Sequence, residues 1–234
     1  MPQVLITGAS RGLGLEFSRQ YASDGWQVLA TCRNPDKSKK LLSLADKLEN
    51  ISIYRMDISD NDSVDTCALK LQDKNIDVLI NNAGIASNDF NTQKLGGFDF
   101  KFWERVFRVN TLGAFKVTQA FLRNINSSTQ KKIAIVSSKV GSLSDMNSYP
   151  VYPYATSKAA LNKGVRLMSE QLKKDGISVI CLCPGHARTD MGLMAEGASI
   201  EVDDAVSGMR DMIDKLNIHN SGSFKQFDGQ NLSW

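Results

Sequence analysis

Short hydrophobic runs recur along the chain and alternate with longer segments in which hydrophobic residues return every three or four positions. The short runs are rich in Val, Ile and Leu and are too short for helices, so they predict β-strands. The predicted strands are Val4–Ile6, Gln27–Thr31, Ile51–Tyr54, Val78–Ile80, Ile133–Val136, Ile177–Leu182 and Phe224–Phe227.

The longer segments have the spacing of amphipathic helices. The clearest are Leu15–Ala22, Leu41–Leu48, Val64–Leu71 and Trp103–Phe121. Because parallel strands need crossover connections, this alternation predicts an α/β fold: a doubly wound parallel sheet (Rossmann fold) of about seven strands with helices on both faces. The chain contains no internal repeat and no linker, so we expect one domain over residues 1–234.

Turn and capping residues agree with these elements. Asp24-Gly25 and Asp175-Gly176 are typical of helix ends, where glycine adopts the left-handed conformation. Asp60 or Asp62 is placed to cap the helix that ends near Leu71.

Composition indicates a soluble globular protein, with 42% hydrophobic and 23% charged residues among 234. The net charge of +3 is small and Lys and Arg are dispersed, which argues against a nucleic-acid partner. The basic cluster at Lys37, Lys39 and Lys40 is interpreted as a solvated helix start. No leader-like start and no apolar run of about 18–20 residues is present, so we expect no membrane partner and a cytoplasmic location.

The four cysteines, Cys32, Cys67, Cys181 and Cys183, show neither a disulfide framework nor a paired metal-binding pattern. We interpret them as small core residues in a reducing compartment, with Cys181 and Cys183 on the same side of one strand. Only two histidines occur, and we predict no metal site.

The first predicted strand leads directly into a glycine-rich loop, Thr7–Gly14, and a helix follows. Glycines allow a tight turn and a close approach of the backbone, and the helix N-terminus offers N–H groups to a pyrophosphate. The loop therefore predicts a dinucleotide site. Its candidate cofactor-binding residues are Gly8, Ser10, Arg11, Gly12, Leu13 and Gly14.

The end of the second predicted strand indicates which dinucleotide is bound. NAD-selective folds commonly carry an Asp or Glu there, but this chain continues Ala30-Thr31-Cys32-Arg33. Arg33, with Arg11 in the glycine loop, can bind a 2′-phosphate, so we predict NADP(H). The alternative is that both arginines are merely exposed.

Tyr154 and Lys158 are four residues apart, which places both on one face of a helix. A neighbouring ammonium lowers a phenol pKa toward the value that a general acid/base needs. Ser138 follows the strand Ile133–Val136, where ligands bind in parallel sheets, and can donate a hydrogen bond to a carbonyl oxygen. Asn110 lies inside a helical pattern, although asparagine has no preference for the interior of a helix.

These motifs, in this order, resemble the short-chain dehydrogenase/reductase family from the first predicted strand to the last. The resemblance implies an Asn110–Ser138–Tyr154–Lys158 catalytic tetrad, in which the asparagine and its kinked backbone hold a proton-relaying water. It also implies that Asp57 and Ile58 contact adenine and that Asn81–Gly84 lines the cofactor. Further cofactor contacts implied by it are Asn82, Ala83, Gly84, Tyr154, Lys158, Pro184, Gly185 and Thr189.

Several of these residues have simpler interpretations. Asp57 or Thr189 could cap a helix, and Asn81 and Asn82 could form a turn. Ser137 or Ser142 could replace Ser138, although Ser138 keeps the family's Ser-x-x-Gly pattern. The sixteen residues from Ser138 to Tyr154 exceed the spacing in many members, so Ser148–Pro153 would add length beside the substrate pocket.

The segment Thr31–Asn34 and the tail Ser221–Trp234 resemble a smaller branch that contains C-factor proteins and sniffer-type carbonyl reductases. This resemblance implies an NADPH-dependent oxidoreductase that acts on a small carbonyl or alcohol substrate, with Tyr154 as general acid/base. The alternative is a cofactor-binding signalling or sensing protein with little turnover. The family resemblance also implies a homodimer or homotetramer through the helices that carry Asn110 and Tyr154.

Overall fold

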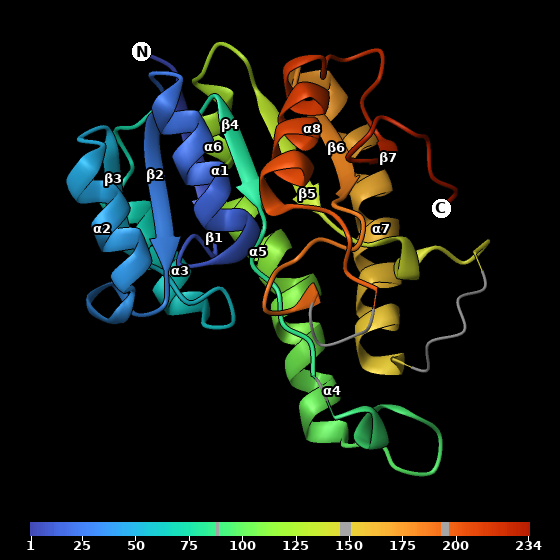
Figure 1. Ribbon diagram of the computed structural model, residues 1–234. Helices are drawn as coiled ribbons and strands as arrows, with labels where there is room; N and C mark the ends of the chain where they lie inside the picture. Colours follow the sequence, from blue (N-terminus) through green and yellow to red (C-terminus); the bar gives the residue numbers. More distant parts are fainter. Residues whose placement is uncertain (88, 146–150, 193–196) are drawn as a thin grey trace.

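The computed structural model describes residues 1–87, 89–145, 151–192 and 197–234. Seven strands form one parallel sheet in the order β3-β2-β1-β4-β5-β6-β7 (Figure 1). The strands are β1 (Gln3–Thr7), β2 (Gln27–Cys32), β3 (Ile51–Arg55), β4 (Val78–Asn81), β5 (Lys132–Val136), β6 (Ser178–Cys183) and β7 (Ser223–Gln226). The predicted α/β fold with a doubly wound parallel sheet is confirmed, and each strand lies within two residues of its predicted ends.

Helices cover both faces of this sheet, as Figure 1 shows. The α-helices are α1 (Gly12–Ser23), α2 (Lys39–Lys47), α3 (Asn61–Lys70), α4 (Phe100–Phe107), α5 (Ala114–Ala120), α6 (Leu122–Asn126), α7 (Tyr152–Leu172) and α8 (Val202–Asp214). Short helical turns are η1 (Pro35–Lys37), η2 (Phe90–Gln93), η3 (Arg108–Gly113), η4 (Lys139–Gly141) and η5 (Lys173–Asp175). None of the helices in the described residues is long and apolar enough to cross a membrane.

The alternation of side chains along each strand produces two hydrophobic cores. On one face, Leu5 of β1 packs in a cluster with residues of α3, α5 and α7. On the other face, Val4 and Ile6 pack in a cluster with residues of α1, α2 and α8. All four cysteines are free and buried, and Cys181 and Cys183 lie in the same core, as predicted.

The predicted helix Trp103–Phe121 is present but is not uniform. Its middle, η3, is a π-helical turn that separates α4 from α5 and contains Asn110. π-Turns occur often at functional sites because they displace one residue from regular helical packing. The predicted caps are also found: Asp60 accepts a hydrogen bond from the Asp62 N–H, and Gly25 and Gly176 have positive φ values.

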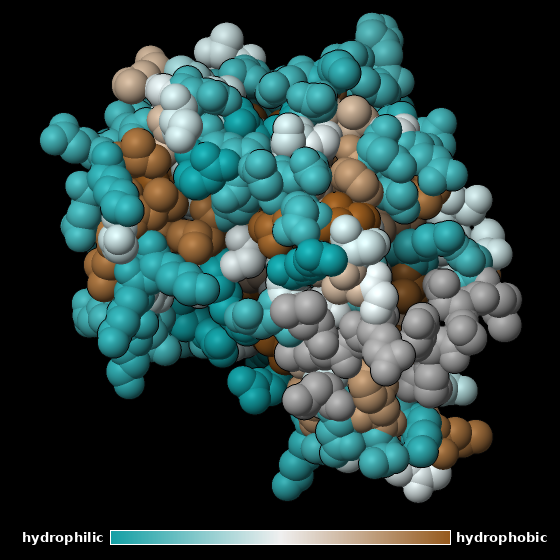
Figure 2. All heavy atoms as spheres, in the orientation of Figure 1, coloured by the Kyte–Doolittle hydropathy of each residue, from teal (hydrophilic) through white to brown (hydrophobic). Residues whose placement is uncertain are grey.

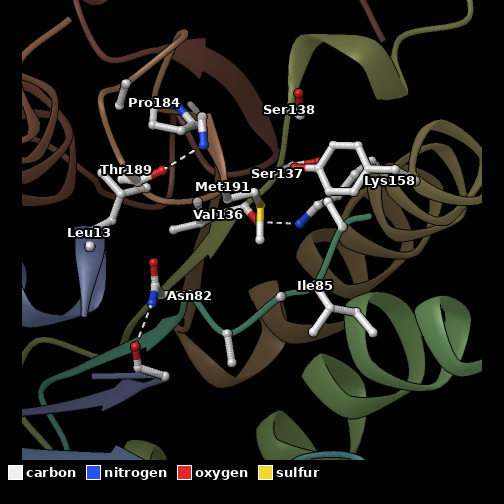
Figure 3. A pocket seen from close by; sticks show the side chains of 18 of the residues that line it. Leu13, Asn82, Ile85, Val136, Ser137, Ser138, Lys158, Pro184, Thr189 and Met191 are labelled. Atoms are coloured by element: carbon white, nitrogen blue, oxygen red, sulfur yellow. Dashed lines mark hydrogen bonds between the residues drawn. The ribbon is translucent and has the colours of Figure 1, made fainter. Parts of the chain in front are cut away.

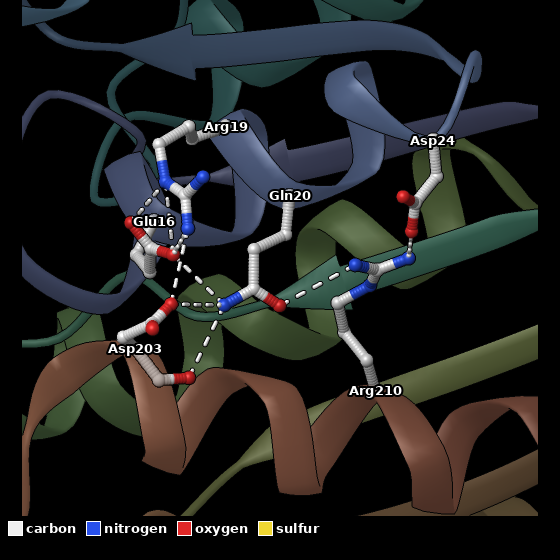
Figure 4. Close-up of polar contacts among 6 residues, drawn as sticks. All are labelled: Glu16, Arg19, Gln20, Asp24, Asp203 and Arg210. Atoms are coloured by element: carbon white, nitrogen blue, oxygen red, sulfur yellow. Dashed lines mark hydrogen bonds and ion pairs between the residues drawn. The ribbon is translucent and has the colours of Figure 1, made fainter.

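A polar network joins α1, which begins at the glycine loop, to α8 (Figure 4). Arg19 donates to Glu16 on its own helix and to Asp203 at the start of α8 (3.0 Å), while Gln20 donates to the Asp203 carboxylate (3.1 Å). Farther along, Arg210 of α8 pairs with Asp24. These contacts fix α8 against the helix whose N-terminus faces the pocket.

Candidate cofactor and substrate site

A cleft of about 550 Å³ lies at the carboxyl ends of the strands, where parallel sheets bind ligands. It runs from the glycine loop and the ends of β2 and β3 to the start of α7 and the loop after β6. In the close view, Leu13 and Asn82 lie on one side of the pocket and Ser138 and Lys158 on the other (Figure 3). On the face in Figure 2 most atoms are hydrophilic, and the hydrophobic atoms occur in small groups between them.

The glycine loop is built by backbone contacts that leave no room for side chains. A Cβ on Gly8 would lie 2.9 Å from the Ala83 Cα, and φ of Gly8 is +69°. A Cβ on Gly14 would lie 2.4 Å from the Gly8 carbonyl oxygen and 2.6 Å from Asn82 Nδ2. Glycine is therefore required at both positions, at Gly8 for its conformation as well as for space.

Asn82 and Thr7 connect this loop to the segment after β4. Asn82 Nδ2 donates to the Thr7 carbonyl (2.9 Å), and the N–H groups of Asn82 and Ala83 each donate to Thr7 Oγ1 (3.0 Å). Asn81 points elsewhere and donates to Thr118 Oγ1 at 3.0 Å. The three hydrogen bonds to Thr7 hold together two loops that follow neighbouring strands.

The far end of the cleft contains the two arginines that were expected to select NADP(H). Arg33 is exposed at the end of β2 and lines the cleft; within the residues that the structure describes it has no ion-pair partner. Arg11 also lines the cleft but pairs with Asp190, with 2.6 Å between Nη1 and Oδ2. This hydrogen bond lowers the pKa of the Asp190 carboxyl.

Asp57 and Ile58 line the same end of the cleft, directly after β3. Asp57 Oδ1 accepts hydrogen bonds from the N–H (2.9 Å) and the hydroxyl (2.7 Å) of Ser59. Asp57 thus stabilises a turn, whereas the cap of α3 is Asp60. A contact between Asp57 and adenine remains a prediction.

Asn110 is buried behind the cleft and does not line it. Its amide makes a two-way contact with the backbone of Ile85, accepting from the N–H at 2.8 Å and donating to the carbonyl at 2.9 Å. It also donates to Ser157 Oγ at 3.2 Å. Asn110 therefore joins the segment after β4 to Ser157 of α7, which lies between Tyr154 and Lys158 in the sequence. The water relay expected beside Asn110 stays a prediction.

Tyr154, Ser138 and Lys158 meet at the opposite end of the cleft from Arg33, and all three line it. The Ser138 hydroxyl lies close enough to the Tyr154 phenol to lower the pKa of that phenol. The Lys158 ammonium lies 5.7 Å from the centre of the Tyr154 ring and donates to the Val136 carbonyl at 2.9 Å (Figure 3). A phenol and an ammonium on α7 are thus grouped with a hydroxyl that follows β5.

The pKa of Tyr154 differs from the prediction. Burial raises it above its ordinary value, charge interaction with Cys183 raises it further, and only the Ser138 hydrogen bond lowers it. Lys158 does not reverse this shift, because its ammonium is bonded to Val136 and not to the phenol. Burial lowers the pKa of Lys158 itself to about 8.

The three candidate serines have different surroundings. Ser137 is 2% exposed, and its hydroxyl donates to Asn162 Oδ1 at 2.6 Å. Ser142 donates to the main-chain oxygen of Trp234 at 3.2 Å and does not line the cleft. Ser138 lines the cleft together with Tyr154, and its hydroxyl lowers the pKa of the phenol, which favours it over the other two.

The loop after β6 forms the roof of the cleft. Pro184, Gly185 and Thr189 all line it. The Thr189 hydroxyl accepts from the Gly192 N–H (3.0 Å), the contact that a helix cap makes with the residue three positions on, so Thr189 has the geometry of a cap as well as lining the cleft. A Cβ on Gly12 would come within 3.3 Å of the Thr189 methyl group, which places this roof directly over the glycine loop.

All predicted site residues except Gly14, Asn81 and Asn110 line the cleft. Gly14 and Asn110 support residues that do, whereas Asn81 contacts Thr118. Other lining residues were not predicted, notably those after β4 and in the roof. The main ones are Cys32, Met56, Ile85, Phe90, Gln93, Lys139, Val140, Val151, Cys183, His186, Asp190, Met191 and Gln226. Only their positions after strand ends could have indicated them. Ser148, Tyr149 and Pro150 lie outside the described residues.

Comparisons of the sequence with known proteins agree on one family. A family model for short chain dehydrogenases matches residues 2–197. The chain is 38% identical to C-signal of Myxococcus xanthus over 159 residues, which is 68% of this chain and 93% of that protein. It is 32% identical over 240 residues to 1-hydroxy-2-glutathionyl-2-methyl-3-butene dehydrogenase of Rhodococcus sp. (strain AD45), with both chains fully covered.

Solved structures of carbonyl reductases have the same fold. The NADPH-bound carbonyl reductase from chicken fatty liver superposes with a TM-score of 0.91 at 30% identity, covering 100% of this chain and 99% of that one. Carbonyl reductase Sniffer of D. melanogaster gives a TM-score of 0.89 at 29% identity, with both chains covered completely.

Proposed function

The chain belongs to the short-chain dehydrogenase/reductase family, and we propose that it is an NADPH-dependent reductase of small carbonyl compounds. The observation that carries this proposal is the grouping of Tyr154, Ser138 and Lys158 in the same cleft as the glycine loop. The name of one relative and the titles of similar structures support the same class of reaction: a dehydrogenase, and carbonyl reductases, one of them NADPH-bound.

The residues present fit a nicotinamide dinucleotide. Gly8 and Gly12 line the cleft at the N-terminus of α1, where close contacts leave no room for a Cβ, and such a terminus attracts a pyrophosphate. Arg33, which pairs with no carboxylate of the described residues, supplies a positive charge for a 2′-phosphate at the end of β2. NADPH, when bound, supplies the hydride.

Tyr154 has the protonation state that carbonyl reduction needs. Because burial raises its pKa, the phenol stays protonated at neutral pH and can give its proton to the developing alkoxide. Ser138 holds the phenol and can donate to the same oxygen. Lys158, protonated below about pH 8, provides the positive charge that stabilises Tyr154 after the proton has left.

Consumption of NADPH with a panel of small aldehydes and diketones tests this function. We expect turnover by the wild type and a loss of about 10²–10⁴-fold in Tyr154→Phe, the usual contribution of a general acid. Equal rates for both proteins on every compound would rule out Tyr154 as the proton donor.

Direct titration tests the cofactor separately. We expect NADPH to bind at least about tenfold more tightly than NADH, because a guanidinium–phosphate pair is worth roughly 1.4 kcal/mol or more in a partly desolvated site. Equal dissociation constants for the two would contradict the NADP(H) assignment.

A cofactor-binding sensor with little turnover is the second candidate. It is favoured by the 38% identity to C-signal over 159 residues. Sensing requires the same dinucleotide cleft, so binding alone does not separate the two functions. Tight NADPH binding without turnover on the whole carbonyl panel would favour the sensor.

A further inference from the structure

The segment Ser142–Asp145 starts the long connection between Ser138 and Tyr154. It receives little support from packing, since Leu143 is 84% exposed and Ser144 is exposed as well. Lys139 and Asp145 form an ion pair of 2.9 Å across its two ends. An exposed ion pair of this kind contributes little to stability, and the segment has a second interaction that also holds it in place.

That interaction comes from the other end of the chain. The main-chain oxygen of Trp234 accepts hydrogen bonds from the N–H groups of Leu143 (3.1 Å) and Ser144 (3.4 Å). It also accepts from the hydroxyls of Ser142 (3.2 Å) and Ser144 (3.3 Å). Four donors from three consecutive residues thus converge on one oxygen, beyond β7 in the sequence (Figure 1).

Trp234 is itself fixed to the body of the protein. Its ring packs against Phe224 of β7, with ring centres 5.2 Å apart, and the Arg166 guanidinium of α7 lies 5.7 Å from the ring centre. Arg166 also donates to the Gly222 carbonyl at 2.9 Å, and the Leu232 N–H donates to the Phe224 carbonyl at 2.8 Å. The ring therefore determines where the oxygen lies.

The segment Ser142–Ser144, which is bonded to Trp234, is only one short turn from Ser138. A Cβ on Gly141 would lie 2.7 Å from the Lys158 Cβ, so η4 packs directly on the backbone of α7. The Gly141 N–H donates to the Ser138 carbonyl at 3.0 Å, and Ser138 lines the cleft together with Tyr154. A shift of Ser142 therefore reaches Ser138 through three residues.

We propose that Trp234 is a positioning residue: it holds the segment Ser142–Ser144 and thereby sets the place of Ser138 beside Tyr154. We call the contact between Trp234 and Ser142–Ser144 the tether. Its effect on catalysis rests on the proposed reductase function, whereas the tether itself does not. This assigns a role to the tail Asn231–Trp234, which lies outside the glycine loop, the tetrad and the roof of the cleft.

Hydrogen–deuterium exchange of Trp234→Ala, without any substrate, tests the tether. We expect the Leu143 and Ser144 amides to exchange at least about tenfold faster, because the main-chain oxygen that accepts from both is no longer held in place by the ring, while the amides of α1 are unchanged. Trp234→Phe keeps a ring against Phe224 and is expected to retain most of the protection. Trp26→Ala is the matched control, since Trp26 is also a partly buried ring but packs on Tyr21, far from the segment.

Steady-state kinetics test the consequence. For Trp234→Ala we expect kcat to fall about tenfold, with KM for NADPH within about twofold of the wild type, because the glycine loop is not touched. Trp234→Phe should recover kcat to within about threefold, and Ser144→Ala should fall between the two. A merely structural role would lower the melting temperature, as in Trp26→Ala, without this split between kcat and KM.

The outcomes separate the two proposals. Unchanged exchange at Leu143 and Ser144 in Trp234→Ala would overturn the tether whatever the enzyme does. Faster exchange with wild-type kcat would overturn the positioning role. A wild type without turnover or NADPH binding would instead contradict the proposed function, and the exchange result would still decide the tether.

Discussion

The two halves of the cleft are built in different ways. In the cofactor half, backbone touches backbone: Gly8 lies against Ala83, and Gly14 lies against Gly8 and Asn82. In the substrate half, the segment after Ser138 is held by side chains and by a distant part of the chain, through the Lys139–Asp145 ion pair and the bonds to Trp234. A close backbone contact accepts only glycine, whereas a loop held by a few polar bonds tolerates many sequences. We therefore expect the cofactor half to be the rigid one and the substrate half to carry specificity.

The largest effect is expected from Ser138→Ala in the substrate half. Loss of a donor to the developing oxyanion usually costs about 10²–10³ in kcat. NADPH affinity should change by less than about threefold, since Ser138 lies away from the glycine loop.

Ser137→Ala is the matched control, because its hydroxyl faces Asn162 and not Tyr154. We expect a loss of stability of about 1–3 kcal/mol from the unpaired Asn162, with a much smaller effect on kcat. An equal loss of kcat in both variants would contradict the choice of Ser138.

Gly8→Ala compared with Gly25→Ala tests the backbone contact of the cofactor half. Both glycines have positive φ, but a Cβ on Gly25 meets nothing within 4 Å. The crowded variant should be less stable than its control by about 1–3 kcal/mol and should bind NADPH at least about tenfold more weakly. Chemical denaturation and NADPH titration measure the two quantities. Equal effects would show that backbone strain alone, and not contact with Ala83, is important.

Arg33→Asp sharpens the assignment of charge in the cofactor half. A carboxylate repels a 2′-phosphate and can bind a ribose hydroxyl, so we expect the NADPH-to-NADH affinity ratio to fall about tenfold or to reverse. Arg19→Ala, on the outer side of α1, is the control. An unchanged affinity ratio in Arg33→Asp would show that Arg11, and not Arg33, distinguishes NADPH from NADH.

The smallest effect is expected from pH. Burial lowers the Lys158 pKa to about 8, below its ordinary value, so the ammonium is present at pH 7 and is lost as the pH rises through 8. With Tyr154 still protonated, kcat/KM for reduction should fall roughly fourfold between pH 7 and pH 8.5. A pH-rate profile, with Lys158→Met as reference, measures this fall in kcat/KM. A flat profile in the wild type would show that the charge of Lys158 does not limit the reaction.

The same difference between the halves explains what could be predicted from sequence. The seven strands, the glycine loop and the Tyr154–Lys158 pair depend on local pattern, and all lie where expected. The Arg11–Asp190 pair joins residues 179 positions apart, and no local signal connects them. The helix α8 was missed because Gly208 weakens its helical pattern; the glycine is needed since a Cβ would lie 2.1 Å from the Phe227 carbonyl oxygen.

The pKa of Tyr154 shows a further limit of sequence reasoning. The four-residue spacing correctly places Lys158 beside Tyr154, yet it does not reveal that the ammonium bonds Val136. The direction of the shift depends on burial, which a spacing does not report.

Single-turnover oxidation of protein-bound NADPH by a small carbonyl compound, followed through the reduced nicotinamide, tests the central claim most directly. We expect rapid oxidation in the wild type, and in Tyr154→Phe a rate at least about 10²-fold lower with NADPH still bound at the wild-type affinity. Equal single-turnover rates in the two proteins would contradict the claim that Tyr154 delivers the proton.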